Sequence, residues 1–313
     1  MKIQYSVENK NCLTSIKVIK LDDKDVSEEG ILEIPIPAII SGKKISSIGK
    51  TFAMGPTFFS IHDIFSKNLD CLERLSVIKF NMENGPSVIR NFSIEESAKV
   101  ILHIPESVEI LDDCCFSSVK DKDAIAFKEL TFDENCKIDK IGAYAFQHCS
   151  FDNKFILPKK CKSIEQGGFS HCLFHKGFEI PEDSSLEKVE TRAFCGSIIL
   201  NENGCLSFSN RLQVLEGLAF SKCKGLEKIN LSKSNKLLEV ESKCFSQADV
   251  EEIDFGENTK VSIQNSCFEG TKYLKKVILS PFAVNIHPLA FKGLSVSDIK
   301  KVVTGANFVK FED

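Results

Sequence analysis

The 313-residue sequence predicts a β-rich solenoid of stacked repeats. Three observations predict this fold class: a phenylalanine motif recurring every 23–30 residues, a strand-like run in the same phase, and 42% hydrophobic residues without a long apolar stretch. Each motif has an aliphatic residue five positions before the phenylalanine and Ala, Gly or Cys immediately before it. The eight motifs end at Phe116, Phe146, Phe169, Phe194, Phe220, Phe245, Phe268 and Phe291.

Short runs upstream of each motif alternate apolar and polar residues, as in Ile229, Asn230 and Leu231. A period of two indicates a strand with one buried face. One repeat cannot bury its own apolar face, so we expect successive repeats to stack as rungs about 4.8 Å apart. Stacking also explains the small residue before each phenylalanine, because a bulky side chain would clash with the neighbouring rung.

Composition excludes several other classes of protein. The net charge is −4, and lysine and arginine are not clustered, which argues against nucleic-acid binding. No apolar stretch is long enough to insert into a membrane, and the N-terminus lacks a signal-peptide pattern, so the sequence as given predicts a cytoplasmic protein. The 13 cysteines include no C-x-x-C pair, and we interpret most of them as reduced core residues.

Several segments resemble the BspA-type leucine-rich repeats, whose consensus runs L-x-x-I-x-I-P-x-S-V-x-x-I-G-x-x-A-F-x-x-C. The segments are HIPESVEILDDCCF (103–116), KIGAYAFQHC (140–149) and ILEIPIPAIISGKKISSIGKTF (31–52), and the resemblance covers roughly residues 31–294. It implies a curved, right-handed leucine-rich-repeat superhelix with a parallel β-sheet on one face and short turns and helices opposite. It also implies binding to proteins or cell surfaces, and it supplies no catalytic residues.

The repeats need terminal caps, since the ends of a solenoid expose its core. Alternating residues predict a β-hairpin cap over 1–30, and residues 295–313 predict a C-terminal strand cap after about ten repeats. Phe58, Ile61, Phe65, Leu69 and Leu72 fall at helical spacing, which predicts a helical insertion near 57–72. This insertion either completes the core or projects toward a partner.

The alternation places variable side chains on the open sheet face, and we expect them to form a binding surface. The polar candidates are Glu129, Lys154, Glu179, Lys228, Asn230, Glu252, Asp254 and Lys276, with Ile101, Ile156, Ile199 and Ile278 as apolar contacts. The alternative interpretation is that neighbouring opposite charges merely solvate the sheet.

Cysteine and histidine positions raise two further possibilities. His148 with Cys149 and His171 with Cys172 occupy equivalent turns, where stacking could create a zinc site. Cys244 and Cys267 are equivalent residues of adjacent rungs, within reach of a disulfide. Because cysteine fills a repeated small-residue position, core packing is the favoured interpretation of both pairs, and we predict no metal site.

The expected function rests on the repeat alone, because the sequence contains no catalytic motif and implies no cofactor. We expect a non-enzymatic solenoid that binds a protein partner of unknown identity, with cell-surface adhesion or host interaction implied by the family. Alternatives are an intracellular scaffold, a self-associating repeat protein and, more remotely, an enzyme. The sequence does not indicate an oligomeric state.

Overall fold

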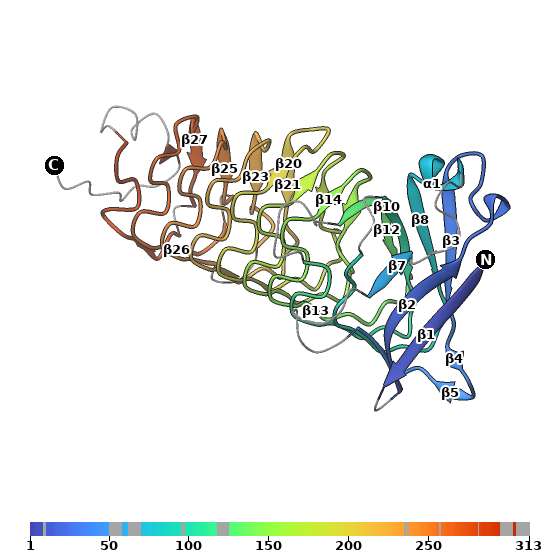
Figure 1. Cartoon of the computed structure of the whole chain (residues 1–313). Coiled ribbons are helices and arrows are strands. Elements are labelled where there is room, and N and C mark those ends of the chain that lie inside the picture. Colours follow the sequence, from blue (N-terminus) through green and yellow to red (C-terminus); the bar gives the residue numbers. More distant parts are fainter. Residues whose placement is uncertain are drawn as a thin grey trace. The chain divides into compact units, whose positions relative to one another are not determined.

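The computed structural model describes residues 1–8, 11–49, 58–61, 70–94, 98–117, 125–234, 236, 238–256, 258–280, 282–294 and 303–304. The chain divides into two compact units. Unit 1 comprises Met1–Ile138 and Ala145–Asn153, and unit 2 comprises Asp139–Tyr144 and Lys154–Asp313. Each unit is built from parallel strands that recur once or twice per rung, which confirms the solenoid that the repeat predicts (Figure 1).

Unit 1 contains two parallel arrays of strands. One array runs β2 (Cys12–Lys20), β6 (Ser47–Ile48), β9 (Val88–Ile89) and β11 (Ile110–Leu111). The other runs β3 (Ile31–Ile36), β8 (Val77–Met82), β10 (Lys99–Ile104), β12 (Ala126–Phe132) and β14 (Ser150–Phe151). β4 (Ile39–Ile40) and β5 (Lys43–Lys44) form a small antiparallel pair.

The first array begins with an antiparallel pair, in which β1 (Lys2–Glu8) lies beside β2 and Tyr5 lies opposite Ile16. β2 contributes buried Leu13, Ile16 and Val18 to the core of unit 1. A 3-10 turn at Asp23–Asp25 follows β2. The N-terminal residues are therefore a β-hairpin whose second strand joins the repeat sheet.

The helical insertion predicted near 57–72 is wrong at its start and confirmed at its end. Residues Phe59–Ile61 form a strand, β7, that pairs in parallel with β2, and a helix, α1, starts only at Asp70 and ends at Arg74. Phe58 and Phe59 are buried against other aromatic rings, so packing in the core replaces the helical pattern. Residues 62–69 lie outside the described part of the chain.

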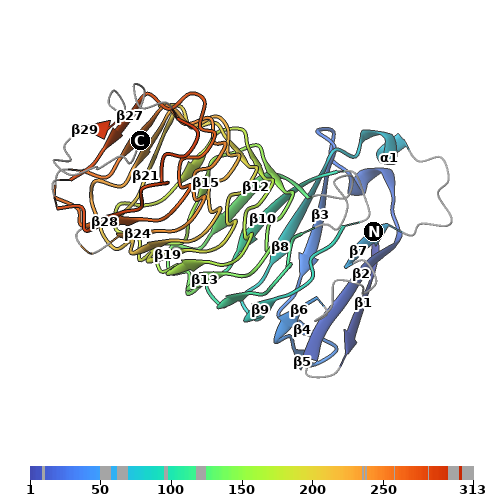
Figure 2. The ribbon, with the colours of Figure 1, turned by 90° about the vertical axis from the view of Figure 1, so that its left-hand side faces the viewer.

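Unit 2 also has parallel arrays. The longest runs β13 (Lys140–Ile141), β16 (Ser163–Ile164), β19 (Lys188–Val189), β22 (Val214–Leu215), β24 (Leu238–Val240), β26 (Val261–Ile263) and β28 (Asn285–Ile286). Figure 2 shows β19, β24 and β28 following one another along one edge. A second array runs β21 (Cys205–Ser207), β23 (Lys228–Asn230), β25 (Glu252–Asp254), β27 (Lys276–Ile278) and β29 (Val303–Thr304).

Two shorter pairs complete unit 2. β15 (Phe155–Ile156) pairs with β18 (Phe178–Glu179), and β17 (Leu173–Phe174) pairs with β20 (Ile198–Ile199), both in parallel. The predicted C-terminal cap can be checked only at β29, which pairs with β27. The other residues of 295–313 are outside the described range.

The turn around each phenylalanine is a stacked element rather than a short helix. In the rung of Phe245, Lys243 and Gln247 both adopt positive φ, at 59° and 56°, and the same two positions recur around Phe194 and Phe220. The N–H of Phe220 donates to the carbonyl of Cys244 in the next rung at 2.8 Å, and Phe245 donates to Cys267 at 3.0 Å. These hydrogen bonds join successive turns as strands are joined in a sheet.

The repeated phenylalanines form aligned columns of stacked rings, as the sequence predicts. In unit 2 the ring of Phe245 lies parallel to that of Phe268, with centroids 5.8 Å apart and planes 4° apart. Phe169, Phe194, Phe220 and Phe291 continue this column. The residues before these phenylalanines are small and buried, as at Ala193, Ala219 and Cys244. The column is the core of the unit.

Candidate functional site

The outer face of the β21–β27 sheet brings together most of the candidate residues predicted for unit 2. The strands pair in register, so Lys228, Glu252 and Lys276 form one column. Asn230, Asp254 and Ile278 form the second column. Between the columns the side chains alternate inward, and Ile229, Ile253 and Val277 are buried. Alternation along each strand therefore sets which residues reach the outer face.

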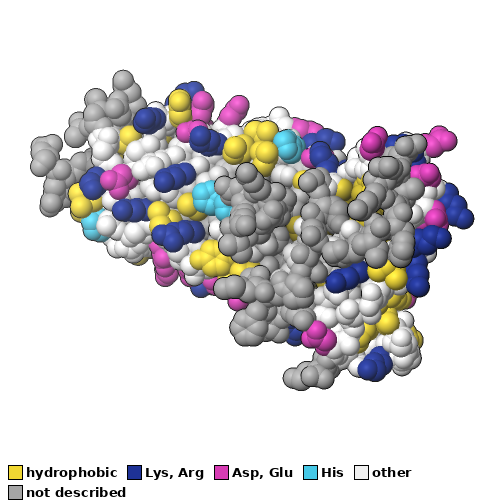
Figure 3. Space-filling model, viewed as in Figure 1, with side chains coloured by type: hydrophobic (Ala, Val, Ile, Leu, Met, Phe, Trp, Pro, Cys, Tyr) yellow, Lys and Arg dark blue, Asp and Glu magenta, His cyan; other side chains and the backbone are white. Residues whose placement is uncertain are grey.

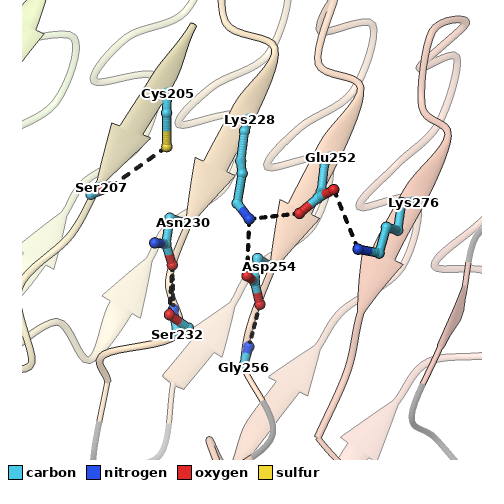
Figure 4. Close-up of polar contacts among 9 residues, drawn as sticks. All are labelled: Cys205, Ser207, Lys228, Asn230, Ser232, Glu252, Asp254, Gly256 and Lys276. Carbon is cyan, nitrogen blue, oxygen red and sulfur yellow. Dashed lines mark hydrogen bonds and ion pairs between the residues drawn. The ribbon is translucent and has the colours of Figure 1, made fainter. Parts of the chain in front are cut away.

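Four charged side chains on this face form a continuous ion ladder, which we define as Lys228, Glu252, Asp254 and Lys276 (Figure 4). Lys228 Nζ lies 2.6 Å from Glu252 Oε1 and 3.1 Å from Asp254 Oδ2. Lys276 Nζ lies 3.5 Å from Glu252 Oε2. The ladder therefore crosses three adjacent strands and carries no net charge.

The closest ion pair of the ladder shifts the pKa of both its members, Lys228 and Glu252. The hydrogen bond from Lys228 holds the pKa of Glu252 below its ordinary value. The hydrogen bond to Glu252 raises the pKa of Lys228, although burial opposes this shift. Both shifts favour the charged forms of Lys228 and Glu252, so this pair is stabilised as an ion pair.

Backbone contacts anchor the second column of the outer face. Asn230 Oδ1 accepts hydrogen bonds from the N–H of Ser232 at 3.0 Å and from its Oγ at 2.7 Å. Asp254 Oδ1 accepts one from the N–H of Gly256 at 2.9 Å. Each polar side chain is thereby held by the turn that follows its own strand, which leaves it little rotational freedom.

The remaining candidates form smaller groups. In unit 2, Lys154 Nζ lies 3.3 Å from Glu179 Oε2, and Ile156, which is 51% exposed, pairs in register with Glu179. In unit 1, half-buried Ile101 pairs in register with exposed Glu129. The candidate residues therefore fall into separate groups, of which the ion ladder is the most connected.

Ile199 is wrong as an exposed contact. Its side chain is 0% exposed and pairs in register with buried Phe174, whereas its neighbour Ile198 points outward. The rung of Phe194 has a longer connection than its neighbours: β21 starts 11 residues after Phe194, but β23 starts 8 residues after Phe220. Because of this longer connection, the residues that continue the outer columns in that rung lie in β21 and not at the isoleucines.

Sequence reasoning missed the residues that take these places. Cys205 lies in register with Lys228, and Ser207 lies in register with Asn230. The alternation in Cys205, Leu206 and Ser207 is the signal that could have found them, since Leu206 is buried between two outward-facing residues.

A pocket of about 250 Å³ lies where β18 and β21 meet without a ladder of backbone hydrogen bonds. Its lining includes Lys154, Glu179, Asn201, Glu202, Cys205 and Ser207. Asn201 closes the break from inside: its Oδ1 accepts the N–H of Phe178 at 2.8 Å, and its Nδ2 donates to the carbonyls of Phe178 and Cys205. This amide replaces the missing strand contacts.

The cysteines of the histidine–cysteine turns point into the core. Cys149 Sγ donates to the carbonyl of Phe116 at 3.3 Å in unit 1, and Cys172 Sγ donates to that of Ser170 at 3.9 Å in unit 2. Cys244 and Cys267 are buried free thiols. Across the described residues, no group of three or more His, Cys, Asp or Glu side chains has a metal-binding arrangement. No helix within the described ranges is long and apolar enough to span a membrane.

Comparisons with known proteins show which family and which solved structures this chain is similar to. A family model described as a BspA type leucine rich repeat region in six copies matches residues 87–205 and 204–313. No curated protein matches the chain. Among solved structures, a leucine-rich repeat protein from Bacteroides ovatus is 17% identical, with 91% of this chain and 74% of that chain covered and a TM-score of 0.41. The pneumococcal vaccine antigen PcpA is 12% identical, with 99% of this chain and 96% of that chain covered and a TM-score of 0.34.

The family model matches more than half of the chain's length, and the chain has the stacked rungs of a repeat protein. The chain therefore belongs to the BspA-type leucine-rich repeat proteins.

Proposed function

We propose that this chain is a non-enzymatic protein-binding module, and that the outer face of the β21–β27 sheet contacts the partner. The observation that carries the proposal is the ion ladder, which fixes four charged groups on adjacent in-register strands. A surface whose side chains are already ordered loses little conformational entropy on binding. Such a face suits recognition of one particular protein surface.

The chemistry of the face suggests the kind of partner. Two lysines and two carboxylates alternate across the strands, and half-exposed Ile278 lies beside them. A partner with carboxylates opposite the lysines and basic groups opposite the carboxylates would match this pattern. A partner of uniform charge would meet repulsion at two of the four positions. The ion ladder therefore provides specificity more than raw affinity.

The test is a variant that reverses the sign of all four charges: Lys228→Glu, Glu252→Lys, Asp254→Lys and Lys276→Glu together. Its net charge equals that of the native chain, so nonspecific electrostatic attraction is unchanged. The matched control exchanges the exposed pair Lys159 and Asp183, whose atoms lie 2.9 Å apart outside the strands. Partners recovered by cross-linking to the intact chain are identified and purified, and their affinities for the three proteins are measured.

We expect the inverted variant to bind a purified partner at least tenfold more weakly, while the Lys159–Asp183 exchange leaves the affinity unchanged. Equal affinity for the inverted variant would place the binding surface elsewhere. The thermal unfolding midpoints of all three proteins are compared first, because the conclusion requires an intact fold.

A further inference from the structure

The pocket at the break between β18 and β21 adjoins the face that carries the ion ladder. Cys205 and Ser207, which line the pocket, lie in register with Lys228 and Asn230 on the neighbouring strand β23. Figure 4 shows β21, with Cys205 and Ser207, next to β23. Adjacent strands are about 4.8 Å apart, so a protein that covers the ladder reaches the pocket one strand beyond Lys228. The ladder and the pocket therefore belong to one continuous surface of unit 2.

The size of the pocket suits a single side chain. Its volume is about 250 Å³, which is below the roughly 300–1,000 Å³ of pockets that enclose a drug-sized ligand. The hollow lies where β18 and β21 are not joined by a ladder of backbone hydrogen bonds. It is thus a small gap in a sheet and not a cleft for a large substrate.

Hydrogen bonds and an ion pair hold the walls of the pocket in place. On the side of β21, Asn201 Nδ2 donates to the carbonyl of Cys205 at 2.6 Å, and Asn203 Oδ1 accepts the N–H of Cys205 at 3.0 Å. Across the break, Lys154 Nζ lies 3.3 Å from Glu179 Oε2. Walls that are already ordered lose little conformational entropy when the pocket is filled.

The lining combines apolar side chains beneath the surface with polar groups at the opening. Phe178, Ile180 and Leu206 line the pocket and are buried, whereas Asn203 and Ser207 are exposed. The charged lining residues are two lysines and two glutamates, whose formal charges cancel: Lys154, Lys176, Glu179 and Glu202. The pocket is therefore neutral overall, with an apolar floor and a polar rim.

An aromatic ring that carries a hydroxyl matches this lining best. A charged side chain would lose its water and meet a rim whose charges already cancel. A purely apolar side chain would displace water from the polar rim without replacing its hydrogen bonds. Tyrosine buries an apolar ring, keeps a hydroxyl for a polar partner, and has only two side-chain torsions to order.

We propose that this pocket receives one tyrosine side chain of the protein that contacts the ion ladder. The ring lies over Phe178 and Leu206, and the hydroxyl makes its hydrogen bond at the rim beside Ser207. The proposal rests on the function proposed above, because the tyrosine belongs to the same partner. It divides the work between two parts of one surface: the charges of the ladder provide specificity, and the buried aromatic side chain provides affinity.

The first experiment needs no partner, because half-buried Cys205 in the pocket wall reports whether the pocket is filled. Iodoacetamide is added to the full chain, and peptide mass spectrometry follows the rate at which each thiol is alkylated. We expect saturating N-acetyltyrosinamide to slow the alkylation of Cys205 by about threefold or more, since a filled pocket shields the thiol. N-acetylphenylalaninamide, which lacks the hydroxyl, and N-acetylleucinamide are expected to leave the rate nearly unchanged. Half-buried Cys114 of unit 1 is the internal control.

Two results of this experiment would overturn the proposal. Equal protection of Cys205 by all three amides would remove the assignment to tyrosine. No protection by N-acetyltyrosinamide, or equal protection of Cys114, would show that the pocket does not hold a tyrosine side chain.

The second experiment connects the pocket with the partner. Ser207→Phe, at an exposed position of the pocket lining, is expected to fill the pocket with a ring of its own. It should weaken the binding of the purified partner at least tenfold and abolish the protection of Cys205. Ser262→Phe makes the same change at the outward-facing serine of β26 and should alter neither result. Thermal unfolding midpoints are compared first, and the amide experiment on the unaltered chain decides the proposal if a variant does not fold.

Failure of this proposal and failure of the proposed function give different results. Partner affinity that falls in Ser207→Phe but not in the four-charge variant would support the pocket and overturn the role of the ion ladder. Affinity that falls in the four-charge variant but not in Ser207→Phe would overturn the pocket and leave the ladder as the binding surface.

Discussion

The side-chain amide of Asn201 pairs with the backbone of Phe178 at two points, through its Oδ1 to the N–H at 2.8 Å and through its Nδ2 to the carbonyl at 3.2 Å. A neighbouring strand would satisfy the same two groups in an unbroken sheet. Gly177 makes this close approach possible, since a Cβ there would lie 2.0 Å from Asn201 Oδ1.

The contact between Gly177 and Asn201 can be tested by a double-mutant cycle. Gly177→Ala places a methyl group against the amide at a φ of 92°, and Asn201→Ala leaves backbone groups of Phe178 unpaired. We expect each change to lower the free energy of unfolding by about 1–3 kcal/mol, and the double variant to lose less than their sum. Urea unfolding measures these differences. Gly293→Ala is the control for backbone strain alone, because its φ is 86° and no atom lies within 4 Å of the added Cβ.

The stacked phenylalanine column predicts a steep cost for losing one ring. Phe245→Ala is expected to lower the free energy of unfolding by about 3–5 kcal/mol, because the ring is fully buried between Phe220 and Phe268. Phe282→Ala removes an equally large but exposed ring and is expected to change it by about 0.5 kcal/mol or less. Similar losses for the two variants in urea unfolding would contradict a core built on the column.

Positive φ at the repeated turns predicts a stabilising substitution. Lys222 is exposed, adopts a φ of 60°, and donates its N–H to the carbonyl of Ser246, a contact that glycine retains. Because glycine enters this region without steric cost, we expect Lys222→Gly to raise the free energy of unfolding by up to about 1 kcal/mol. Lys224→Gly, at an exposed residue of ordinary φ two positions away, is expected to lower it by about 0.5–1 kcal/mol. A loss in both variants would show that the turn tolerates lysine without strain.

Buried thiols predict selective protection from alkylation. Burial raises the pKa of the Cys244 and Cys267 thiols well above the ordinary value, so neither supplies thiolate at pH 8. We expect iodoacetamide to label half-buried Cys205 in the native protein and to label Cys244 and Cys267 only in urea. Peptide mass spectrometry locates the labels. Rapid native labelling of Cys244 would be incompatible with its place in the core.

The ion ladder predicts a loss of stability in acid. The pKa of Glu252 is depressed in the folded chain, so its contribution is present above its ordinary pKa and is lost as the pH falls through the folded value. We expect the free energy of unfolding to fall between pH 7 and pH 3 by up to about 1 kcal/mol more in the native chain than in Glu252→Gln, since solvent screens the pair. Glu202→Gln, at an exposed carboxylate in the neighbouring loop, should behave as the native chain does.

The placement of the candidate site was only partly accessible from sequence. The outer columns of β23, β25 and β27 follow directly from alternation, because each strand repeats the same phase relative to its phenylalanine. Ile199 fails because a longer connection shifts the phase in one rung, and local alternation in Ile198 and Ile199 does not tell which side faces inward. The helix expected near 57–72 fails at Phe59–Ile61 because apolar spacing alone does not distinguish a short buried strand from a helix.

By itself, the sequence determined the repeat, the strand phase and the phenylalanine column, since all three are encoded by residues within one rung and recur at nearly constant spacing. Only the tertiary structure decided that Lys228, Glu252 and Asp254 pair across strands, and that Asn201 fills a break between β18 and β21. Those relationships join residues more than twenty positions apart. They depend on how neighbouring rungs meet, which spacing within a single rung does not specify.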